Sequence, residues 1–330
     1  MPSVVPAMHF NQRQSAALLQ QMPTMHFDVE QDSTWTAATE VQTYLDFYGI
    51  NFAKTLQAVH GFGAVDACGF RIASHYWLPA NPQGTLIVVH GYYDHVGIFS
   101  HVIEFGLRNN LAVLAFDLPG HGLSSGEQVA IDSFDQYADV LDVLMQAARP
   151  LLPAPYFALG QSTGGAALLN YLWRYDAARA APLLERVALC APLVLPRSWG
   201  TSRVLYALLH RFIKRLPHGR ARSSHDADFN RFIDEQDCLH SPTLSVRWVG
   251  AMKAWDKQFR QFSPLLSSVL MVQGDEDMTV AWRYNLQQIQ RALPNTQVVM
   301  VPGAGHQLVN ETELLRTQVF NAISRYFFSD

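Results

Sequence analysis

Short apolar runs alternate with segments of helical periodicity along most of this chain, and that alternation restricts its fold more than any other feature. The apolar runs lie at residues 85–89, 111–116, 156–159, 187–190, 269–272 and 297–301. One of the segments between them repeats apolar side chains at helical spacing, at Phe134, Tyr137, Ala138, Leu141, Leu144 and Met145. Nearly continuous apolar runs are typical of parallel strands that are covered on both faces. The pattern predicts an α/β fold with an open, mostly parallel, doubly wound sheet.

The remaining segments predict how this fold is elaborated. Residues 1–34 are polar and are predicted to form a loosely held N-terminal extension. The stretch between the fourth and fifth apolar runs is too long to be a single crossover connection. We therefore expect residues 193–264 to form a helical cap, inserted before the last two strands of a core that comprises residues 35–192 and 265–330.

The composition excludes several classes of function. Hydrophobic residues make up 49% of the chain, enough to close a large core, and 24 Lys and Arg against 28 Asp and Glu give a net charge of -4. Because duplex binding relies on a basic surface, no nucleic-acid partner is expected. Cys68, Cys190 and Cys238 lie far apart without a C-x-x-C spacing, which argues against a disulfide framework or a zinc site. Together with an N-terminus that lacks a signal-peptide pattern, this predicts a cytoplasmic location.

A G-x-S-x-G pentapeptide occupies residues 160–164, directly after the apolar run 156–159 and directly before a helical run. In this strand-turn-helix context the pattern is typical of a nucleophile elbow, where glycines allow a tight turn that projects the serine hydroxyl. The alternative is a glycine-rich helix start with no chemical role. The context favours Ser162 as a nucleophile, and the backbone N–H of Thr163 then becomes one donor of an oxyanion hole.

Two later strand ends carry the groups that a serine nucleophile needs. Gly274 is followed by Asp275, Glu276 and Asp277, and the last apolar run is followed by a turn that ends in His306. A serine hydroxyl is a weak nucleophile near neutral pH, so an imidazole must accept its proton and a carboxylate must orient that imidazole. The pattern predicts His306 as the base. Spacing by itself leaves the neighbouring carboxylates open as the acid.

The first apolar run ends in a loop, residues 90–95, that is placed to supply a second oxyanion donor from its backbone. His90 and His121 precede glycines in loops and are expected to have structural roles. Aromatic side chains from this loop and from the cap predict an apolar pocket, and the candidates for substrate binding are Tyr93, Trp199, Tyr206 and Phe212.

Taken together, these motifs resemble the α/β-hydrolase superfamily, and within it the branch of monoacylglycerol lipases and lysophospholipases. The resemblance spans residues 85–327 and is carried by His90-Gly91 with Asp94-His95-Val96-Gly97, by residues 117–124, by residues 160–165, by Gly274-Asp275-Glu276-Asp277 and by Gly303-Ala304-Gly305-His306. In that branch the acid is the fourth residue of a G-x-x-D turn, which implies Asp277. The loop oxyanion donor is the second residue after the His of the H-G pair, which implies the N–H of Tyr92.

The function that this resemblance implies is hydrolysis of carboxylic esters of lipid-like alcohols through an acyl-enzyme on Ser162, with no metal or organic cofactor. Thioesterase, amidase or peptidase, and acyltransferase activities on the same scaffold are the alternative enzymes. A ligand-binding protein that has lost catalysis is the alternative outside the enzymes.

The cap contains an unusual basic segment. Residues 203–222 include six Lys or Arg residues and no acidic residue, together with apolar residues at helical spacing. The pattern predicts a basic amphipathic helix, for which there are two interpretations. In one, Arg211, Lys214 and Arg215 face an anionic lipid surface as part of a lid. In the other, which is slightly favoured, the basic face pairs with the acidic residues Asp226, Asp228, Asp234, Glu235 and Asp237.

Overall fold

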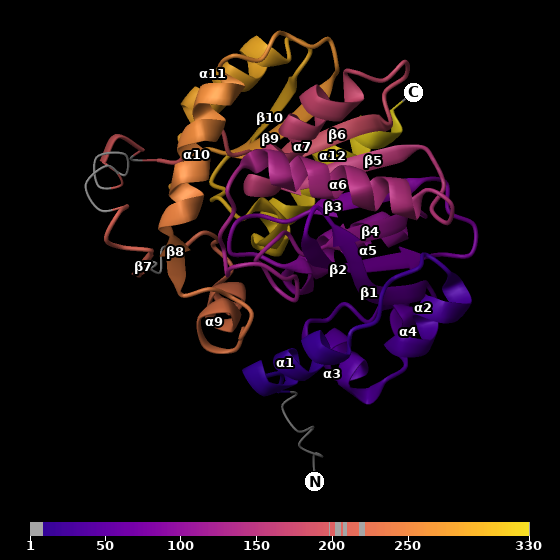
Figure 1. Ribbon diagram of the computed structural model, residues 1–330. Coiled ribbons are helices and arrows are strands. Elements are labelled where there is room, and N and C mark those ends of the chain that lie inside the picture. Colours follow the sequence, from indigo (N-terminus) through magenta and orange to yellow (C-terminus); the bar gives the residue numbers. More distant parts are fainter. Residues whose placement is uncertain (1–8, 198, 202–205, 207–209, 218–221, 330) are drawn as a thin grey trace.

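Figure 1 shows the computed structural model, which describes residues 9–197, 199–201, 206, 210–217 and 222–329. Its centre is an eight-stranded sheet with the order β1-β2-β4-β3-β5-β6-β9-β10. The strands are β1 (Val59–Ala67), β2 (Phe70–Leu78), β3 (Thr85–Val89), β4 (Ala112–Phe116), β5 (Tyr156–Gln161), β6 (Leu184–Cys190), β9 (Val269–Gly274) and β10 (Gln297–Val301). Only β2 runs antiparallel to its neighbours β1 and β4, and the other pairs are parallel. The predicted open, mostly parallel sheet is confirmed.

Helices cover both faces of the sheet, which explains why its central strands are apolar throughout. Alternate residues point to opposite faces, so Ile87 and Val89 of β3 pack into one core while Leu86 and Val88 pack into the other. The first core is closed by α6 (Phe134–Ala148), α7 (Thr163–Tyr171), α10 (Val246–Phe259) and α11 (Trp282–Ala292). The second is closed by α5 (Ser100–Arg108), α12 (Glu313–Phe328) and N-terminal helices.

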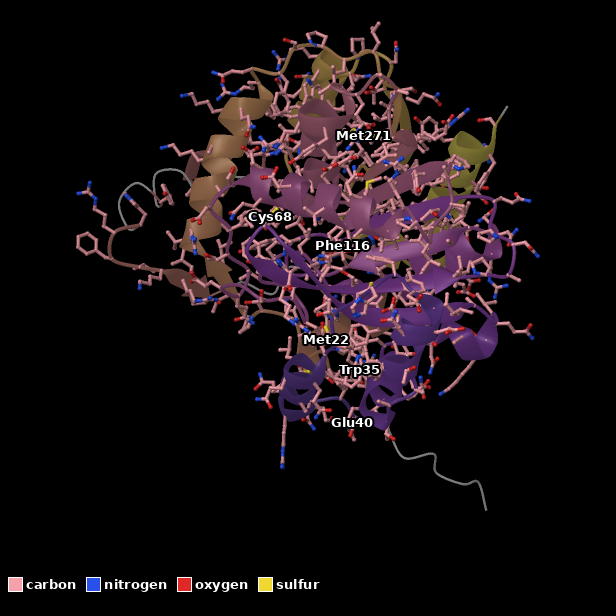
Figure 2. All side chains as sticks on the ribbon, turned by 45° about the vertical axis from the view of Figure 1, so that its right-hand side comes forward. Met22, Trp35, Glu40, Cys68, Phe116 and Met271 are labelled. Atoms are coloured by element: carbon pink, nitrogen blue, oxygen red, sulfur yellow. The ribbon has the colours of Figure 1, made fainter. Side chains whose placement is uncertain are left out.

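The expectation of a loosely held N-terminal extension was wrong for the part that the structure describes. Residues 9–55 form a packed layer, here called the N-terminal layer, with helices α1 (Gln12–Gln21), α2 (Val29–Thr36), α3 (Thr39–Phe47) and α4 (Phe52–Thr55). Phe10, Leu18 and Met22 are buried against the second core, and Figure 2 shows Met22 and Trp35 where these helices meet the body of the protein. The polar composition led to the wrong expectation because each short helix buries only a narrow apolar stripe and is polar elsewhere.

Between β6 and β9 the chain forms the cap segment, which lies to one side of the sheet in Figure 1. Its described elements are β7 (Arg215–Pro217), α9 (Ala227–Glu235), β8 (Thr243–Ser245) and α10. The predicted basic helix is wrong over its second half, because residues 210–212 form a turn and Arg215 lies in a strand that pairs with β8. The predicted helix also included Arg203 and Arg220, which lie outside the described residues.

Within the described part of this segment, Arg215 is not paired with the downstream acidic residues. Arg215 contacts Glu127 of the core at 3.4 Å and donates to the Gln128 carbonyl at 3.0 Å. Of the acidic residues proposed as its partners, Asp226 caps α9 and Asp228 pairs with Arg231. Arg215, which lies in β7, therefore contacts the core and not these two acidic residues.

A pair of buried histidines joins β1 to β2. His60 Nε2 lies 3.1 Å from His75 Nδ1, and the two rings are stacked beside Trp77 and Phe62. Burial lowers the pKa of His60 to about 3, and burial together with the neighbouring His60 lowers the pKa of His75. The pair therefore stays neutral in the folded protein, with one ring donating to the other.

We expect this pair to make folding stability fall with acidification. Unfolded histidine binds a proton near pH 6.5 while the folded pair does not, so below that pH the unfolded chain holds more protons. Each histidine should then remove up to about 1.4 kcal/mol of unfolding free energy per pH unit. Urea unfolding between pH 7.5 and 5 measures the slope. It should flatten in the double variant His60→Asn, His75→Asn and remain in His210→Asn, which changes an exposed histidine; an unchanged slope in the double variant would contradict the assignment.

Candidate active site

Ser162 stands at the turn between β5 and α7. Its backbone has φ 54° and ψ -111°, a conformation that residues other than glycine rarely adopt. The turn is held because the Ser162 N–H donates to the Cys190 carbonyl at 2.8 Å and the Leu193 N–H donates to the Ser162 carbonyl at 3.0 Å. This strained turn lifts the side chain above the carboxyl edge of the sheet.

The glycines of the pentapeptide are required by close backbone approach. A Cβ at Gly160 would lie 2.6 Å from the Gly164 carbonyl carbon, and a Cβ at Gly164 would lie 2.0 Å from the Val89 carbonyl oxygen. Both distances are far below van der Waals contact, so side chains here would push α7 away from β5 and β3. The local pattern therefore sets how tightly the helix that follows Ser162 sits on the sheet.

The structure brings Ser162, His306 and Asp277 into one hydrogen-bonded chain. His306 Nε2 lies 3.0 Å from Ser162 Oγ, and His306 Nδ1 lies 2.8 Å from Asp277 Oδ2. All three residues are buried, with Ser162 7% exposed at the cavity floor. The Gln161 side chain donates to the His306 carbonyl at 2.8 Å, which fixes the base relative to the serine.

Among the carboxylates left open by spacing, Asp277 is the one that contacts the imidazole. Asp275 is exposed and accepts the Gly303 N–H at 2.7 Å, and Glu276 reaches outward to His225 at 3.4 Å. Asp277 instead turns inward because its Oδ1 accepts the N–H groups of Thr279 and Val280.

The Asp277 carboxylate is held in its charged form. Burial alone would raise the pKa of this carboxyl, but the adjacent His306, with its hydrogen bond and the two backbone donors, keeps the pKa below its ordinary value. Gln273 Nε2 also donates to Asp277 Oδ2 at 3.0 Å. A buried carboxylate so placed fixes the proton of His306 on Nδ1, which leaves Nε2 free to accept the serine proton.

The loop after β3 lies against the serine. A Cβ added to Gly91 would sit 3.4 Å from Ser162 Cβ, so the backbone of this loop at Gly91 lies close to the nucleophile. Asp94 shapes this loop by accepting the Gly91 N–H at 3.1 Å and the Gln307 side-chain amide at 2.8 Å. Burial raises the pKa of Asp94 to about 6 despite the opposing Gln307 hydrogen bond.

The hydroxyl of Tyr92 is engaged away from the serine. It donates to the Val129 carbonyl at 2.7 Å and accepts the Ser245 N–H at 3.3 Å, while its ring stacks on Trp248 at 4.0 Å. The phenol thus ties the cap to the core. Thr163, the first residue of α7, is fully buried.

His90 and His121 hold loops together. The Leu118 N–H donates to His90 Nε2 at 2.8 Å, and His121 Nδ1 lies 2.9 Å from the Pro119 carbonyl. Burial lowers the pKa of both imidazoles, to about 4 for His121. Neither ring reaches Ser162 through a hydrogen bond recorded in the described part of the chain.

A cavity of about 440 Å³ opens above Ser162, between the core and the cap segment. Its walls are mainly apolar and aromatic, and they include the predicted Tyr93, Trp199 and Tyr206. Phe212, the fourth candidate, does not line it: the side chain is 84% exposed on a turn of the cap. Sequence reasoning failed there because a helix was assumed through a segment that turns.

Sequence reasoning also missed residues that complete the site. Gln307, next to the base, holds Asp94, and Leu244, Val246 and Val249 of the cap line the cavity. Their only signal in the sequence is proximity to His306 or an apolar character shared with many core residues. Among the described residues, no group of three His, Cys, Asp or Glu side chains is arranged to hold a metal ion.

The sheet order, the serine on a strained turn after β5 and the histidine after β10 define a protein with the α/β-hydrolase fold. Comparison with known proteins makes this more specific. The chain belongs to the hydrolase family described as serine aminopeptidase, S33, whose model matches residues 80–313.

Curated relatives lie in the same branch. A monoacylglycerol lipase of Mycolicibacterium smegmatis is 27% identical over 79% of this chain and 94% of that protein. The human monoglyceride lipase is 28% identical over 79% of this chain and 88% of its own length. Among solved structures, a soluble variant of the Saccharomyces cerevisiae monoglyceride lipase shares the fold with a TM-score of 0.68 and 17% identity, covering 80% of this chain and 94% of that one.

The different roles of Asp277 and Asp275 can be tested by substitution. Asp277→Asn should lower turnover on the order of 10⁴-fold, because an amide cannot keep the His306 proton on Nδ1. Asp275→Asn, the matched control, should retain activity within a few-fold, since its carboxylate contacts only a surface turn. Initial rates with p-nitrophenyl butyrate measure both. A crippling effect of Asp275→Asn with an active Asp277→Asn would reverse the assignment.

Proposed function

We propose that this protein hydrolyses carboxylic esters of lipid-like alcohols through an acyl-enzyme on Ser162. The observation that carries the proposal is a hydrogen-bonded chain from Asp277 through His306 to Ser162 that ends in an apolar cavity. Nucleophile, base and orienting acid are within hydrogen-bond distance of one another, as acyl transfer requires.

In the first half of the reaction, Ser162 Oγ attacks the ester carbonyl carbon while His306 Nε2 takes the hydroxyl proton. The oxyanion that forms accepts hydrogen bonds from the backbone N–H groups of Tyr92 and Thr163. The carbon–oxygen bond to the alcohol then breaks, and His306 returns the proton to the leaving alkoxide. Asp277 stabilises the imidazolium throughout.

In the second half, a water molecule takes the place of the alcohol. His306 accepts one of its protons as the oxygen attacks the acyl carbon, and the same oxyanion donors serve again. The bond to Ser162 Oγ breaks, the serine regains its proton, and the carboxylic acid leaves. Net consumption is one ester and one water.

The substrate class rests on the cavity and the relatives. The walls contributed by Trp199, Tyr206, Leu244 and Val249 suit an acyl or alkyl chain, because burying apolar surface there contributes about 25 cal/mol per Å². Two of the relatives named above are monoacylglycerol and monoglyceride lipases. The family description names an aminopeptidase, so peptide amides belong in any substrate panel beside thioesters.

We further propose that the cap turn at residues 211–214 contacts an anionic lipid surface. Phe212 is 84% exposed, and Arg211 and Lys214 beside it are exposed cations. A protruding apolar ring flanked by positive charges matches the chemistry of a lipid interface. Within the described residues, no helix combines the length and apolar character that crossing a bilayer requires.

A reducing compartment such as the cytoplasm is proposed from the cysteines. Cys68, Cys190 and Cys238 are all unpaired, and Cys190 is buried in the strand that precedes the cap. Free thiols are the usual state in compartments that keep cysteines reduced.

The proposed chemistry is tested by serine-directed labelling and a substrate panel. Ser162→Ala should abolish labelling by a fluorophosphonate and lower kcat by several orders of magnitude with the fold intact. Ser263→Ala, at an exposed serine, should match the unmodified protein. The panel comprises monoacylglycerols and p-nitrophenyl esters of several chain lengths, a lysophospholipid, a thioester and an aminoacyl amide. Faster turnover of the thioester or the amide than of every oxygen ester would reject the proposed substrate class.

The lipid-surface proposal predicts a difference between substrate forms. Changing Arg211 and Lys214 to Gln and Phe212 to Ser should weaken hydrolysis from anionic vesicles by about 1 kcal/mol per charge, and added salt should reduce that loss. Hydrolysis of a dissolved short ester should stay unchanged. Leu266→Ser is the control, because Leu266 is 80% exposed just before β9, at the sheet edge opposite the cavity. Equal losses on vesicles and dissolved ester would remove the lipid surface from the proposal.

A further inference from the structure

The N-terminal layer precedes the family match, which begins at residue 80, yet it reaches the active-site loops. Phe47 and Tyr48, at the end of α3, pack on Phe232 of cap helix α9 with ring centroids 5.5 and 5.9 Å apart. Figure 1 shows α1 and α3 lying beneath α9. Other residues of α9, Phe229 and Ile233, line the cavity, so this helix lies between the N-terminal layer and the substrate space.

A buried carboxylate connects the three parts. Asp237, just after α9, accepts the Tyr48 hydroxyl at 2.9 Å on Oδ1 and faces His95 Nε2 at 3.1 Å on Oδ2. The side chains of His95 and Asp237 are both 0% exposed. Tyr48 belongs to the N-terminal layer, Asp237 to the cap segment, and His95 to the loop that carries Tyr92.

The His95 end of this connection is fixed by the backbone. Its Nδ1 accepts the Gly97 N–H at 3.2 Å. Nε2 therefore carries the proton and donates the hydrogen bond to Asp237. The Tyr48 ring lies edge-on to His95 at 5.0 Å, and a Cβ at Gly97 would meet Tyr48 Cγ at 2.7 Å. Tyr48 therefore packs against the backbone at Gly97, between this loop and α5.

The Asp237 carboxylate is held in its charged form beside a His95 ring that donates to it from Nε2. Burial alone would raise the pKa of Asp237, but His95 lowers it, with help from the Leu239 N–H and the Tyr48 hydroxyl. Burial alone would lower the pKa of His95, but Asp237 raises it above its ordinary value. The buried Asp237 carboxylate depends on every hydrogen bond that it receives, since an unsatisfied buried charge is strongly destabilising.

We propose that Tyr48 is a positioning residue for ester hydrolysis: through Asp237 and His95 it fixes both the loop that supplies the Tyr92 N–H and the cap helix that walls the cavity. The inference rests on the proposed function for its kinetic readout. It gives the N-terminal layer a role in the active site beyond packing.

The chain supplies a matched control on the same helix. Tyr44 lies one turn before Tyr48, is fully buried, and has a hydroxyl with no hydrogen-bond partner among the described residues. Tyr48→Phe and Tyr44→Phe remove the same atom from neighbouring buried rings. Only the first removes a donor from Asp237.

The expected result is a separation of kcat from KM. Tyr48→Phe should lower kcat for a short p-nitrophenyl ester about tenfold, because a displaced oxyanion N–H stabilises the transition state less, with KM changed less than about twofold. The rate of fluorophosphonate labelling at Ser162 should fall by a similar factor. Tyr44→Phe should stay within about twofold of the unmodified protein in both. Equal behaviour of the two variants would overturn the inference.

Two further measurements keep the test decisive. Asp237→Asn replaces one acceptor oxygen by an amide group that opposes either the His95 N–H or the Leu239 N–H, and it should reproduce the kcat loss. Combined with Tyr48→Phe it should cost less than the product of the two single effects. Full activity of Asp237→Asn, or independent effects, would reject the connection even if Tyr48→Phe failed to fold. If the unmodified protein labels at Ser162 but hydrolyses no ester in the panel, the proposed function fails, while the labelling rates still decide the role of Tyr48.

Discussion

The backbone strain at Ser162 is the constraint around which the rest of the site is arranged. A non-glycine residue with φ 54° and ψ -111° persists only when its surroundings overdetermine it. Here β5 is paired on both sides, Gly164 packs against the β3 carbonyl, and Cys190 and Leu193 bond the serine backbone. The carboxyl ends of parallel strands meet at one edge, so the loops bearing His306, Asp277 and Tyr92 converge on that turn.

Buried carboxylates organise those loops. Asp94 holds the loop after β3, Asp117 accepts the N–H groups of Val96 and Leu123, and Asp277 accepts those of Thr279 and Val280. Each one satisfies backbone donors that irregular segments leave unpaired, and each charge is offset by several hydrogen bonds. Polar residues in this region therefore serve geometry as much as chemistry.

The cap segment and the N-terminal layer are joined to this frame by aromatic residues with polar tips. Tyr92 stacks on Trp248 and bonds Ser245, while Tyr48 packs on His95 and bonds Asp237. Such residues contribute apolar contact area together with one directional bond. The cap segment and the N-terminal layer are thereby both coupled to the loop beside Ser162.

Local patterns in the sequence were enough to predict the parallel sheet, the turn at Ser162 and the position of His306, because strand periodicity and glycine-rich turns are short-range properties. Contacts between distant segments decided the rest. They turned Asp277 toward His306 and Asp275 outward, exposed Phe212, paired Arg215 with Glu127 and packed residues 9–55 against the core. The bond from Tyr48 to Asp237 spans 189 positions. Its partners carry no common local signal, since burial and charge pairing arise only when the tertiary fold brings them together.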